Sequence, residues 1–545
     1  MQEFLKRISR KVKYKINDVK TLKNLENFDI VLYELYDDKS ISLDEINKVL
    51  SIKEDDFLHN FAHFKKLDFI DLKKEEIDLS LLGKMPPSFM ENRDLVFFKE
   101  DDKYIYVSTY NSFNVSLLDR ISSIFKDKKV KIFISSKIQI SKILDEFILE
   151  KELKELFKEL KFELKSKSDK EQSAVSKLFR LITYEAIKLN SSDIHFEIND
   201  KDALIRFRVD GIMFVFIKLE QDIYNALIFY IKILAHLNVA EKRKAQDGSF
   251  SMEFEGLEYD FRFSSLPIIN GETIVLRILK RKAEILSLDD LKFDEVVLQK
   301  YKKSINLPHG LILLTGPTGS GKSTTLYASL NEIKSESKKI ISAEDPIEYR
   351  IDLVQQILLN EKAGLDFNNA LRAMLRQDPD VIMIGEIRDE QSLDIAIKAS
   401  LTGHLVFSTL HTNDSISAIS RMLDMKAKPY LISCALTVVI AQRLLRKLCP
   451  YCKKISDKKY SEFDGTFFEA ASCKECNYTG YLGRELVSEC LFIDEELSEL
   501  IRINASKAQI LQKAKEKGFK TIFDNALQKA RLGISSIDEI YRVLR

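Results

Sequence analysis

The stretch LILLTGPTGSGKSTTLYA, residues 311–328, decides the fold of this chain. An apolar run leads into the pattern G-x-x-x-x-G-K-S, and a helix-like run follows. A strand, a glycine-rich turn and a helix in this order form a phosphate-binding loop (P-loop), whose backbone N–H groups converge on phosphate oxygens. The Lys322 ammonium supplies charge to the β- and γ-phosphates, and the Ser323 hydroxyl can bind Mg²⁺. We therefore expect a site for a nucleoside triphosphate such as ATP, formed by Gly316, Pro317, Thr318, Gly319, Ser320, Gly321, Lys322, Ser323 and Thr324. The alternative is a glycine-rich turn without a ligand.

Carboxylates follow two apolar runs downstream of this loop. Residues 381–386, VIMIGE, resemble a buried strand that ends in Glu386. Residues 340–348, IISAEDPIE, form a second short run, in which Pro346 should end the strand and leave the carboxylates on a loop. Both groups are expected at the carboxyl edge of a parallel sheet, beside the P-loop. We predict that Glu386 is a Walker B residue and that Glu344 orients the attacking water. The alternative is a pair of solvated carboxylates at strand ends.

Two histidines flank a third apolar run. Residues 401–413 read LTGHLVFSTLHTN, with His404 before the strand-like part and His411 after it. Either imidazole could hydrogen-bond the γ-phosphate or couple it to a neighbouring subunit. The alternative is that both are structural hydrogen-bonding groups.

Four of the six cysteines form two Cys-x-x-Cys pairs, CPYC and CKEC. Two such pairs can place four thiolates tetrahedrally around Zn²⁺. The expected ligands are Cys449, Cys452, Cys473 and Cys476. With four protein ligands the site is closed, so it would stabilise a lobe and would not catalyse. Redox chemistry and free core thiols are the alternatives, and we expect Cys434 and Cys490, which lie in apolar runs, to be core residues.

Length and charge limit the function classes. A chain of 545 residues and 63.0 kDa holds several domains. The net charge of +1 gives no global field for binding nucleic acid, which would need a local basic patch. We expect no signal peptide, and the apolar run at 429–442 is too short to span a bilayer, so we predict a buried helix there. A cytoplasmic protein is expected.

Composition changes along the chain predict four segments. Residues 1–150 mix lysine-rich helix-like runs with short strand-like runs, and residues 151–172 are a charged helical linker. Residues 173–290 are an α+β module. Residues 291–545 alternate buried strands with helices, which predicts an α/β domain with a parallel sheet that carries the P-loop. The zinc lobe should occupy about 446–485.

Taken in chain order, these motifs resemble the secretion ATPase superfamily, specifically the assembly ATPases of type II secretion, type IV pili and competence machines. The resemblance covers residues 173–545. The matching segments are SSDIHFE (191–197), IRFRVDG (205–211), QDG (246–248), FRFSSLP (261–267) followed by GE (271–272), GPTGSGKSTT (316–325), SAEDPIEY (342–349), LRQDPDVIMIGEIRDEQS (375–392), SLTGHLVFSTLHTND (400–414), AQRLLRKLC (441–449) and GYLGRELVSE (480–489).

The resemblance implies a fold and an oligomer. It implies a homo-hexameric cytoplasmic ATPase in which a RecA-like P-loop domain and a preceding PAS-like domain clamp ATP and Mg²⁺. Residues 343–349 would then be the aspartate box, residues 380–388 the Walker B box and residues 402–413 the histidine box. Arginines at four positions match family residues thought to approach the phosphates, some from across the clamp: Arg206, Arg208, Arg262 and Arg277. Strand alternation alone would place such arginines on a wet face.

The resemblance also implies partners. Family members with a zinc lobe extend a pilus or pseudopilus, so this chain resembles an extension motor. Residues 67–111 loosely resemble the family's small α/β N-terminal domain, which docks onto a membrane-anchored protein. In some members this domain binds cyclic di-GMP, but no RLG-type motif lies near the start here, so only docking carries over. An inner-membrane platform protein is the other expected partner, and no stable binding of nucleic acid is expected.

Three functions compete at this stage. The first is ATP hydrolysis that drives assembly of a pilus or pseudopilus, for secretion, pilus extension or DNA uptake. The second is a RecA-like motor that translocates nucleic acid, which the near-zero charge and the lack of a basic-aromatic stripe disfavour. The third is a nucleotide-binding scaffold with little turnover, which the intact Lys322, Glu344 and Glu386 disfavour.

Overall fold

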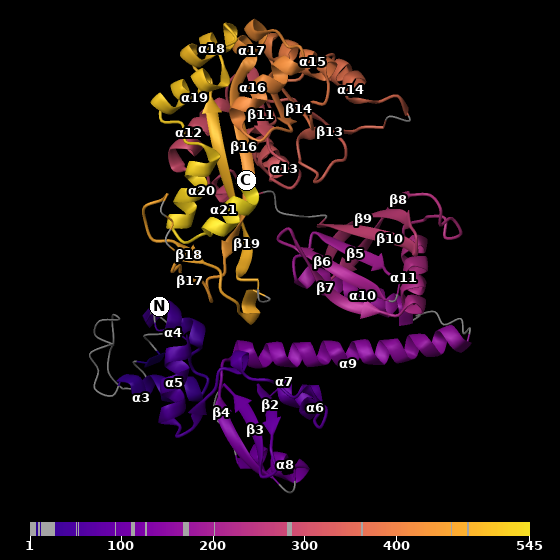
Figure 1. Cartoon of the computed structure of the whole chain (residues 1–545), viewed down its shortest axis with the longest axis vertical. Coiled ribbons are helices and arrows are strands. Elements are labelled where there is room, and N and C mark those ends of the chain that lie inside the picture. Colours follow the sequence, from indigo (N-terminus) through magenta and orange to yellow (C-terminus); the bar gives the residue numbers. More distant parts are fainter. Residues whose placement is uncertain are drawn as a thin grey trace. The chain divides into compact units, whose positions relative to one another are not determined.

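The structure is a computed structural model with two compact units, Met1–Phe179 and Arg180–Arg545 (Figure 1). It describes residues 7–8, 11, 28–50, 52, 54–92, 94–110, 115–125, 128–166, 174–200, 202–280, 286–360, 363–458, 460, 462–476 and 479–544. Within these ranges no helix combines the length and the apolar character that crossing a bilayer requires. The finer partition at residues 150, 172 and 290 remains a prediction.

The first unit contains a helical group and a small sheet. The helices α3 (Phe28–Asp37), α4 (Leu43–Leu50) and α5 (Glu54–Phe64) pack around buried Leu32, Phe57 and Phe61. The sheet has the strand order β1-β4-β3-β2, in which β4 is parallel to β1 and β3 while β2 is antiparallel to β3. Its elements are β1 (Asp68–Phe69), α6 (Leu79–Leu82), α7 (Pro87–Glu91), β2 (Leu95–Glu100), β3 (Tyr104–Thr109), α8 (Val115–Ile124) and β4 (Lys129–Ile134), with a 3-10 turn at Leu72–Lys74.

A long helix, α9 (Lys137–Ser166), follows the sheet of this unit. Glutamates and lysines repeat along it at i,i+4 spacing, and Lys154 pairs with Glu150 in this way. The predicted charged linker at 151–172 is therefore helical as far as Ser166, and its last residues lie outside those described.

The second unit begins with an antiparallel sheet of order β7-β6-β5-β10-β9-β8. The boundary between the units falls within α10 (Ala174–Lys188), and the elements that follow are β5 (Asp193–Ile198), β6 (Ala203–Val209), β7 (Ile212–Leu219), α11 (Gln221–Leu234), β8 (Gln246–Phe254), β9 (Leu257–Ile268) and β10 (Gly271–Lys280). Strict alternation makes one face apolar, and Tyr184 and Ile187 of α10 pack there against Phe254 and Phe261. The opposite face carries charged side chains, including the four arginines that the sequence analysis identified.

A seven-stranded sheet of order β13-β12-β14-β15-β11-β16-β19 follows in the same unit. Six strands are parallel, and β19 at the edge is antiparallel to β16. All six residues of β11 (Gly310–Thr315) are buried, because one hydrophobic cluster covers each face of the sheet. The α/β prediction, with a RecA-like P-loop domain, is confirmed.

The elements of this part are α12 (Glu295–Ser304), α13 (Lys322–Ile333), β12 (Ile340–Glu344), β13 (Val354–Leu358), α14 (Phe367–Met374), β14 (Val381–Ile384), α15 (Glu390–Leu401), β15 (Leu405–Leu410), α16 (Ser415–Asp424), α17 (Pro429–Ala435), β16 (Leu436–Leu448), β17 (Lys454–Ile455), β18 (Phe468–Glu469), β19 (Tyr481–Phe492), α18 (Glu495–Arg502), α19 (Lys507–Glu516), α20 (Ile522–Arg531) and α21 (Ile537–Leu544), with 3-10 turns at Asp289–Leu291 and Lys474–Cys476.

The predicted buried helix at 429–442 is wrong. Helix α17 ends at Ala435, and the chain then enters β16, a central strand between β11 and β19. The β-branched run Val438, Val439, Ile440 favours a strand and is fully buried there. An apolar run of this length fits a buried strand as well as a buried helix, so periodicity alone could not distinguish them.

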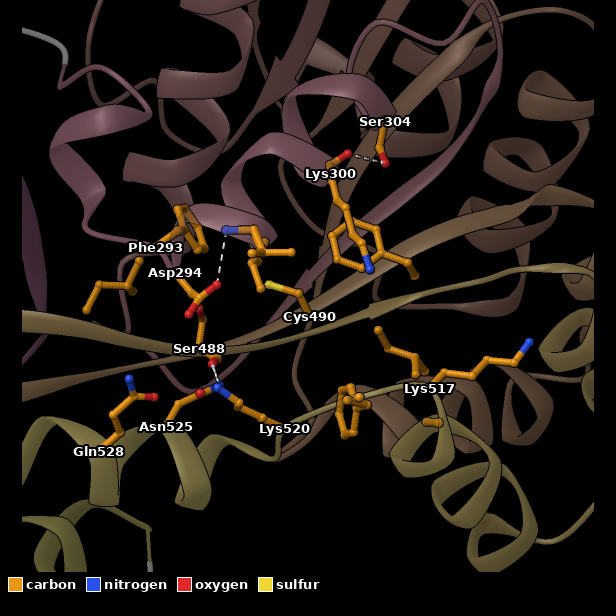
Figure 2. Close-up of a pocket in the computed structure, with 18 of the residues that line it drawn as sticks. Phe293, Asp294, Lys300, Ser304, Ser488, Cys490, Lys517, Lys520, Asn525 and Gln528 are labelled. Carbon is orange, nitrogen blue, oxygen red and sulfur yellow. Dashed lines mark hydrogen bonds between the residues drawn. The ribbon is translucent and has the colours of Figure 1, made fainter.

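A cavity of about 720 Å³ opens beside the edge strand β19 (Figure 2). Phe293 and Lys300 line it on one side, Ser488 and Cys490 in the middle and Asn525 on the other side. None of the P-loop residues lines this cavity. The phosphate site is therefore defined by the P-loop itself and its neighbours, described next.

Candidate nucleotide and metal sites

The P-loop links the buried end of β11 to the first turn of α13. Gly316 has φ +145°, and a Cβ on it would lie 2.5 Å from the carbonyl oxygen of Gln442. Gly319 has φ +77° in open space, so its backbone conformation alone requires glycine. These two positions explain why the motif has glycines there.

Lys322 is the first residue of α13, and its Nζ donates to the carbonyl oxygens of Gly316 at 2.8 Å and Pro317 at 3.0 Å. The ammonium thus lies over the loop whose N–H groups would bind phosphate. Burial lowers the pKa of Lys322, the charge of Glu386 opposes that shift, and the charge of Arg443 adds to it. Phosphate oxygens would replace the two carbonyls and favour the charged form.

Glu386 and His411 lie at the same edge of the sheet. Glu386 comes two residues after β14, and His411 directly follows β15. The Nε2 atom of His411 is 3.1 Å from Oε2 of Glu386, while Arg388 forms an ion pair with Oε1. Since β14 and β11 both flank β15 in parallel, their carboxyl ends meet beside the P-loop. The structure therefore brings Lys322, Glu386 and His411 together.

Glu344 is buried and held by three donors. It is the last residue of β12 and is 4% exposed, so the expected position on a loop is wrong. Ser342 Oγ donates to its Oε1 at 2.6 Å, Gln356 Nε2 donates at 3.0 Å, and the Tyr327 hydroxyl bonds Oε2. Burial and the charge of Glu344 raise the pKa of Tyr327. The strand does end before Pro346, but it includes Glu344, so only the residues after Glu344 lie on the loop.

His404 lies at the other end of β15 from His411. In the parallel register of β11 and β15, Gly310 faces Leu405 and Thr315 faces Leu410. The two histidines are thus about 20 Å apart along the strand. The Nδ1 atom of His404 is 2.9 Å from the carbonyl oxygen of Ala399 near the end of α15, a helix-capping contact. Within one subunit the structure does not bring His404 to the P-loop.

The four predicted arginines lie on the charged face of the six-stranded sheet. Arg208, Asp193, Arg277 and Arg262 are in register across neighbouring strands. Arg277 Nε lies 3.0 Å from Oδ1 of Asp193, and Arg208 Nε lies 3.9 Å from Oδ2.

The other two arginines have separate partners. Arg206 pairs with Glu197 at 2.5 Å. Arg262 Nη1 lies 3.6 Å from Glu348 in the loop after β12, and Nη2 donates to the carbonyl oxygen of Ile347 at 3.3 Å. Burial and the charge of Arg208 lower the pKa of His195 on the same face. Among the described residues, none of the four guanidinium groups bonds to the P-loop.

The four paired cysteines converge at one point. Their Sγ atoms all lie within 4.8 Å of one another, at 3.7 Å for Cys449 to Cys473, 3.8 Å for Cys452 to Cys476 and 3.5 Å for Cys473 to Cys476. Four sulfurs at the Zn–S bond length of ~2.3 Å would be separated by ~3.8 Å. A disulfide would need ~2.05 Å. The donor set therefore fits a tetrahedral metal site.

Backbone groups support this cluster. Burial raises the pKa of the Cys449 and Cys452 thiols. Burial also acts to raise the pKa of Cys476, but hydrogen bonds, including one from the Gly480 N–H at 3.1 Å, lower it below the usual value. Outside the cluster, the expectation that Cys434 is a core residue is wrong, because it is exposed at the end of α17.

Three polar residues near the P-loop did not stand out in the sequence. Thr315 Oγ1 receives the N–H of Thr412 at 2.8 Å, and Arg443 and Glu489 lie within strands of the central sheet. A charged residue inside an otherwise apolar strand is the one sequence signal that could have identified the last two.

The buried parallel sheet, the P-loop and the carboxylate at the neighbouring strand end define a RecA-like P-loop nucleoside triphosphatase. The chain belongs to the type II/IV secretion system protein family, which matches residues 168–542. An MshEN domain matches residues 66–152. The protein is an ATPase.

Curated relatives agree with this assignment. The chain is 43% identical over 385 residues to the type II secretion system ATPase E of Vibrio cholerae, covering 69% of this chain and 76% of that protein. It is 36% identical over 474 residues to the type IV pilus assembly ATPase PilB of Thermus thermophilus, covering 83% of this chain and 52% of that protein. The Legionella pneumophila ATPase DotB matches 67% of this chain and 95% of its own, with TM-score 0.52 and 21% identity, which supports the fold alone.

Proposed function

We propose that this protein is a cytoplasmic, homo-hexameric motor that hydrolyses ATP to ADP and phosphate and thereby drives assembly of a pilus or pseudopilus. The machine served would be type II secretion, type IV pilus extension or DNA uptake. The observation that carries the proposal is the convergence of Lys322, Glu386 and His411 at one sheet edge. Similarity to a secretion ATPase and a pilus assembly ATPase supports the choice of machine.

The nucleotide-binding loop is proposed to act as follows. The N–H groups of residues 316–324 and the Lys322 ammonium bind the phosphates. The donor set fits Mg²⁺, because Ser323 is exposed beside Lys322 and Glu386 supplies a carboxylate oxygen. Mg²⁺, when bound, neutralises charge on the β- and γ-phosphate oxygens. His411 contacts the Glu386 carboxylate and is proposed to donate a hydrogen bond to the γ-phosphate.

Glu344 is proposed to orient the attacking water. Oε1 accepts hydrogen bonds from Ser342 and Gln356, whereas Oε2 accepts one from Tyr327 alone and retains an acceptor position for a water. The bond from Tyr327 is the one that joins Glu344 to the loop after β12, because the Tyr327 hydroxyl also accepts the Glu348 N–H at 3.0 Å.

The arginine-bearing face is proposed to complete the site. Guanidinium groups stabilise charge on the transferring phosphoryl group. Arg206, Arg208, Arg262 and Arg277 would supply this charge, some of them to the site of a neighbouring subunit. His404, at the far end of β15, is proposed to act at a subunit contact and not on the phosphate of its own subunit.

The cysteine cluster is proposed to hold one structural Zn²⁺. The sulfur separations and the Gly480 N–H bond support four thiolate ligands: Cys449, Cys452, Cys473 and Cys476. The site has no open position and serves to hold the lobe between β16 and β19.

The partners are proposed from the N-terminal unit and the relatives. The MshEN match lies in the part expected to dock onto a membrane-anchored protein, and an inner-membrane platform protein would receive the motion. The motor would then be attached to the inner membrane peripherally. No stable nucleic acid binding is proposed.

One set of measurements tests whether the protein forms a hexamer and whether its ATP turnover is independent of DNA. Purified full-length protein would be examined by mass photometry with and without ATP and Mg²⁺, using Glu386→Gln to slow turnover. A hexamer that forms with ATP supports the motor. A monomer under all conditions, or turnover that requires single-stranded DNA, contradicts it.

A further inference from the structure

Arg443 is a buried cation beside the P-loop. It lies on β16, one strand from β11, where Thr315 faces Ala441. It is 8% exposed, and within the described part of the chain no carboxylate lies within 4.0 Å of its guanidinium. Burying an arginine without an ion-pair partner is costly, so its position needs an explanation.

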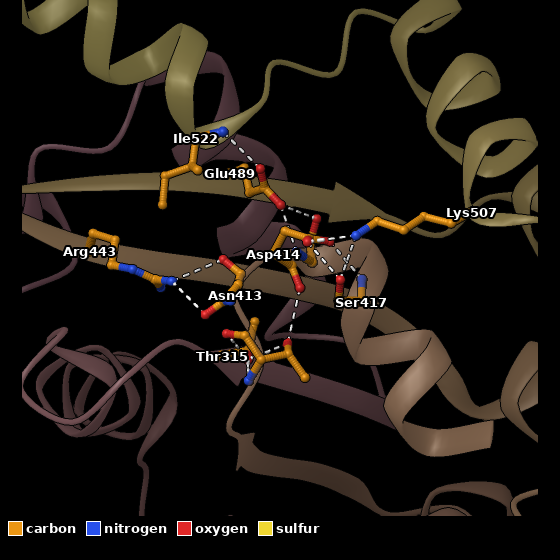
Figure 3. Close-up of polar contacts among 10 residues, drawn as sticks. Thr315, Asn413, Asp414, Ser417, Arg443, Glu489, Lys507 and Ile522 are labelled. Atoms are coloured by element: carbon orange, nitrogen blue, oxygen red, sulfur yellow. Dashed lines mark hydrogen bonds and ion pairs between the residues drawn. The ribbon is translucent and has the colours of Figure 1, made fainter. Parts of the chain in front are cut away.

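The guanidinium instead bridges two backbone segments. Nη1 donates to the carbonyl oxygen of Gln442 at 2.9 Å, and Nη2 donates to the carbonyl oxygen and Oδ1 of Asn413 at 3.2 and 3.3 Å (Figure 3). A Cβ placed on Gly316 would lie 3.2 Å from Nη1. The guanidinium therefore lies next to the first glycine of the P-loop, where a side chain would crowd it, and hydrogen-bonds the loop after β15.

The loop after β15 carries His411 and is also tied to Thr315, the residue of β11 directly before the P-loop. Thr412 N donates to Oγ1 of Thr315 at 2.8 Å, and that hydroxyl donates back to the Thr412 carbonyl oxygen at 3.0 Å. On its far side, Glu489 accepts the Ser415 N–H at 2.6 Å. Arg443 thus belongs, with Thr315 and Glu489, to a set of contacts that holds the loop after β15 in place (Figure 3).

We propose that Arg443 is a positioning residue for ATP hydrolysis: it holds the loop that bears His411 at a fixed separation from the P-loop. The inference rests on the proposed roles of His411 and Glu386. His411 contacts Glu386, so a shift of this loop moves the imidazole relative to the carboxylate and the phosphates. Small displacements of this kind reduce the chemical step more than substrate binding.

The positive charge of Arg443 is also expected to act on the phosphates that the P-loop binds. The only direct acceptors of Arg443 in the described structure are neutral carbonyl and amide oxygens, so its positive charge is not cancelled by a direct ion pair. The guanidinium of Arg443 lies next to Gly316 of the P-loop, which binds the polyanionic phosphates. Replacement by lysine keeps the charge but removes the fork that bonds two segments at once.

The test compares Arg443→Gln with Arg446→Gln. Both remove an arginine from β16, but Arg446 pairs with Glu539 and stacks on Tyr481, away from the P-loop. We expect Arg443→Gln to lower kcat for ATP by about 10- to 100-fold with KM changed less than about threefold. Arg446→Gln should keep kcat within about twofold at a temperature where both are folded. Arg443→Lys should recover part of the kcat. Equal kcat values for the two glutamine variants would overturn the proposal.

A double-mutant cycle tests whether Arg443 affects kcat through His411. In a His411→Ala background, Arg443→Gln should lower kcat by less than about threefold, because the positioned group is already absent. The same fold loss in both backgrounds would overturn the proposed route. If His411→Ala alone is fully active, the proposed role of His411 fails, whereas the comparison with Arg446→Gln still decides whether Arg443 positions the P-loop. If Arg443→Gln does not fold, Arg443→Lys replaces it in the cycle.

Discussion

At the scale of single residues, the environment of a side chain decides its role more than its type. His404 and His411 lie at opposite ends of β15, yet His404 caps a helix and His411 contacts Glu386. Glu344 ends β12 and Glu386 lies two residues after β14, yet Glu344 is buried among three donors whereas Glu386 is half-buried and pairs with Arg388 and His411. Matched substitutions can separate these roles.

The two histidines provide the first prediction. His411→Ala should lower kcat for ATP by about 10- to 100-fold with little change in stability, because it removes the contact to Glu386 at the phosphate edge. His404→Ala should keep kcat within about threefold in a hydrolysis assay that starts from assembled protein. It should instead cost about 1 kcal/mol in the free energy of unfolding through the lost bond to Ala399. Urea denaturation and steady-state kinetics measure the two effects, and the reverse pattern would contradict the assignment.

Sequence reasoning reached the P-loop, the strand that ends before Glu386 and the four cysteines, because each is encoded in a short segment. It could not place Glu344, whose burial depends on Tyr327 and Gln356 from other elements. It also missed Arg443, since its contact with Asn413 joins residues 30 positions apart. Contacts of that kind depend on sheet order, which no local pattern specifies.

At the scale of elements, one side chain joins two helices to the sheet. Glu489 on β19 accepts the Ser415 N–H at 2.6 Å and the Ile522 N–H at 2.7 Å, at the first residues of α16 and α20. Free N–H groups at helix N-termini favour a carboxylate. A buried carboxylate that serves both helices fixes them relative to the edge of the ATPase sheet (Figure 3).

Glu489→Gln should therefore destabilise the fold. An amide can offer only one acceptor oxygen, so one helix N-terminus would face an NH₂ group and lose its partner. We expect a loss of about 1–3 kcal/mol in the free energy of unfolding, measured by urea denaturation. The control Glu499→Gln, an exposed residue paired with Arg502 on α18, should leave the free energy of unfolding nearly unchanged. Equal losses for the two variants would refute the double-capping role.

The cysteine cluster gives a prediction for metal removal. Protein purified without chelator should contain close to one zinc per chain by mass spectrometry of the metal. Cys473→Ser should lose the metal and lower the melting temperature, since structural zinc stabilises its lobe. Cys434→Ser, outside the cluster and exposed, should keep both. Metal-free wild type with an unchanged melting temperature would show that the cluster holds no structural ion.

At the scale of the whole molecule, charge separates a secretion motor from a nucleic-acid motor. Lys and Arg total 85 and Asp and Glu total 84, so the long-range field is weak. Single-stranded DNA should therefore change ATP turnover by less than about twofold at 50 mM salt, a condition that favours electrostatic binding. Turnover that rises strongly with DNA and falls as salt is raised would favour a translocase instead.

The parallel sheet and its helices were predictable from alternating apolar and helical runs. The position of β19, antiparallel at the sheet edge, was not predictable. The segment that carries the four cysteines separates β16 from β19 in the chain, so no local pattern indicates that these two strands pair. The same reasoning explains why 429–442 was misassigned: its apolar residues serve a helix end and then a central strand.

The central claim is that Lys322 and Glu386, at the carboxyl edge of this sheet, perform ATP hydrolysis. The most direct measurement is steady-state phosphate release by purified full-length protein over a concentration series, with Lys322→Ala and Glu386→Gln. We expect activity per chain that rises with concentration as subunits assemble, and at least about 100-fold lower kcat in both variants with unchanged melting temperatures. Wild-type turnover that persists in either folded variant would contradict it.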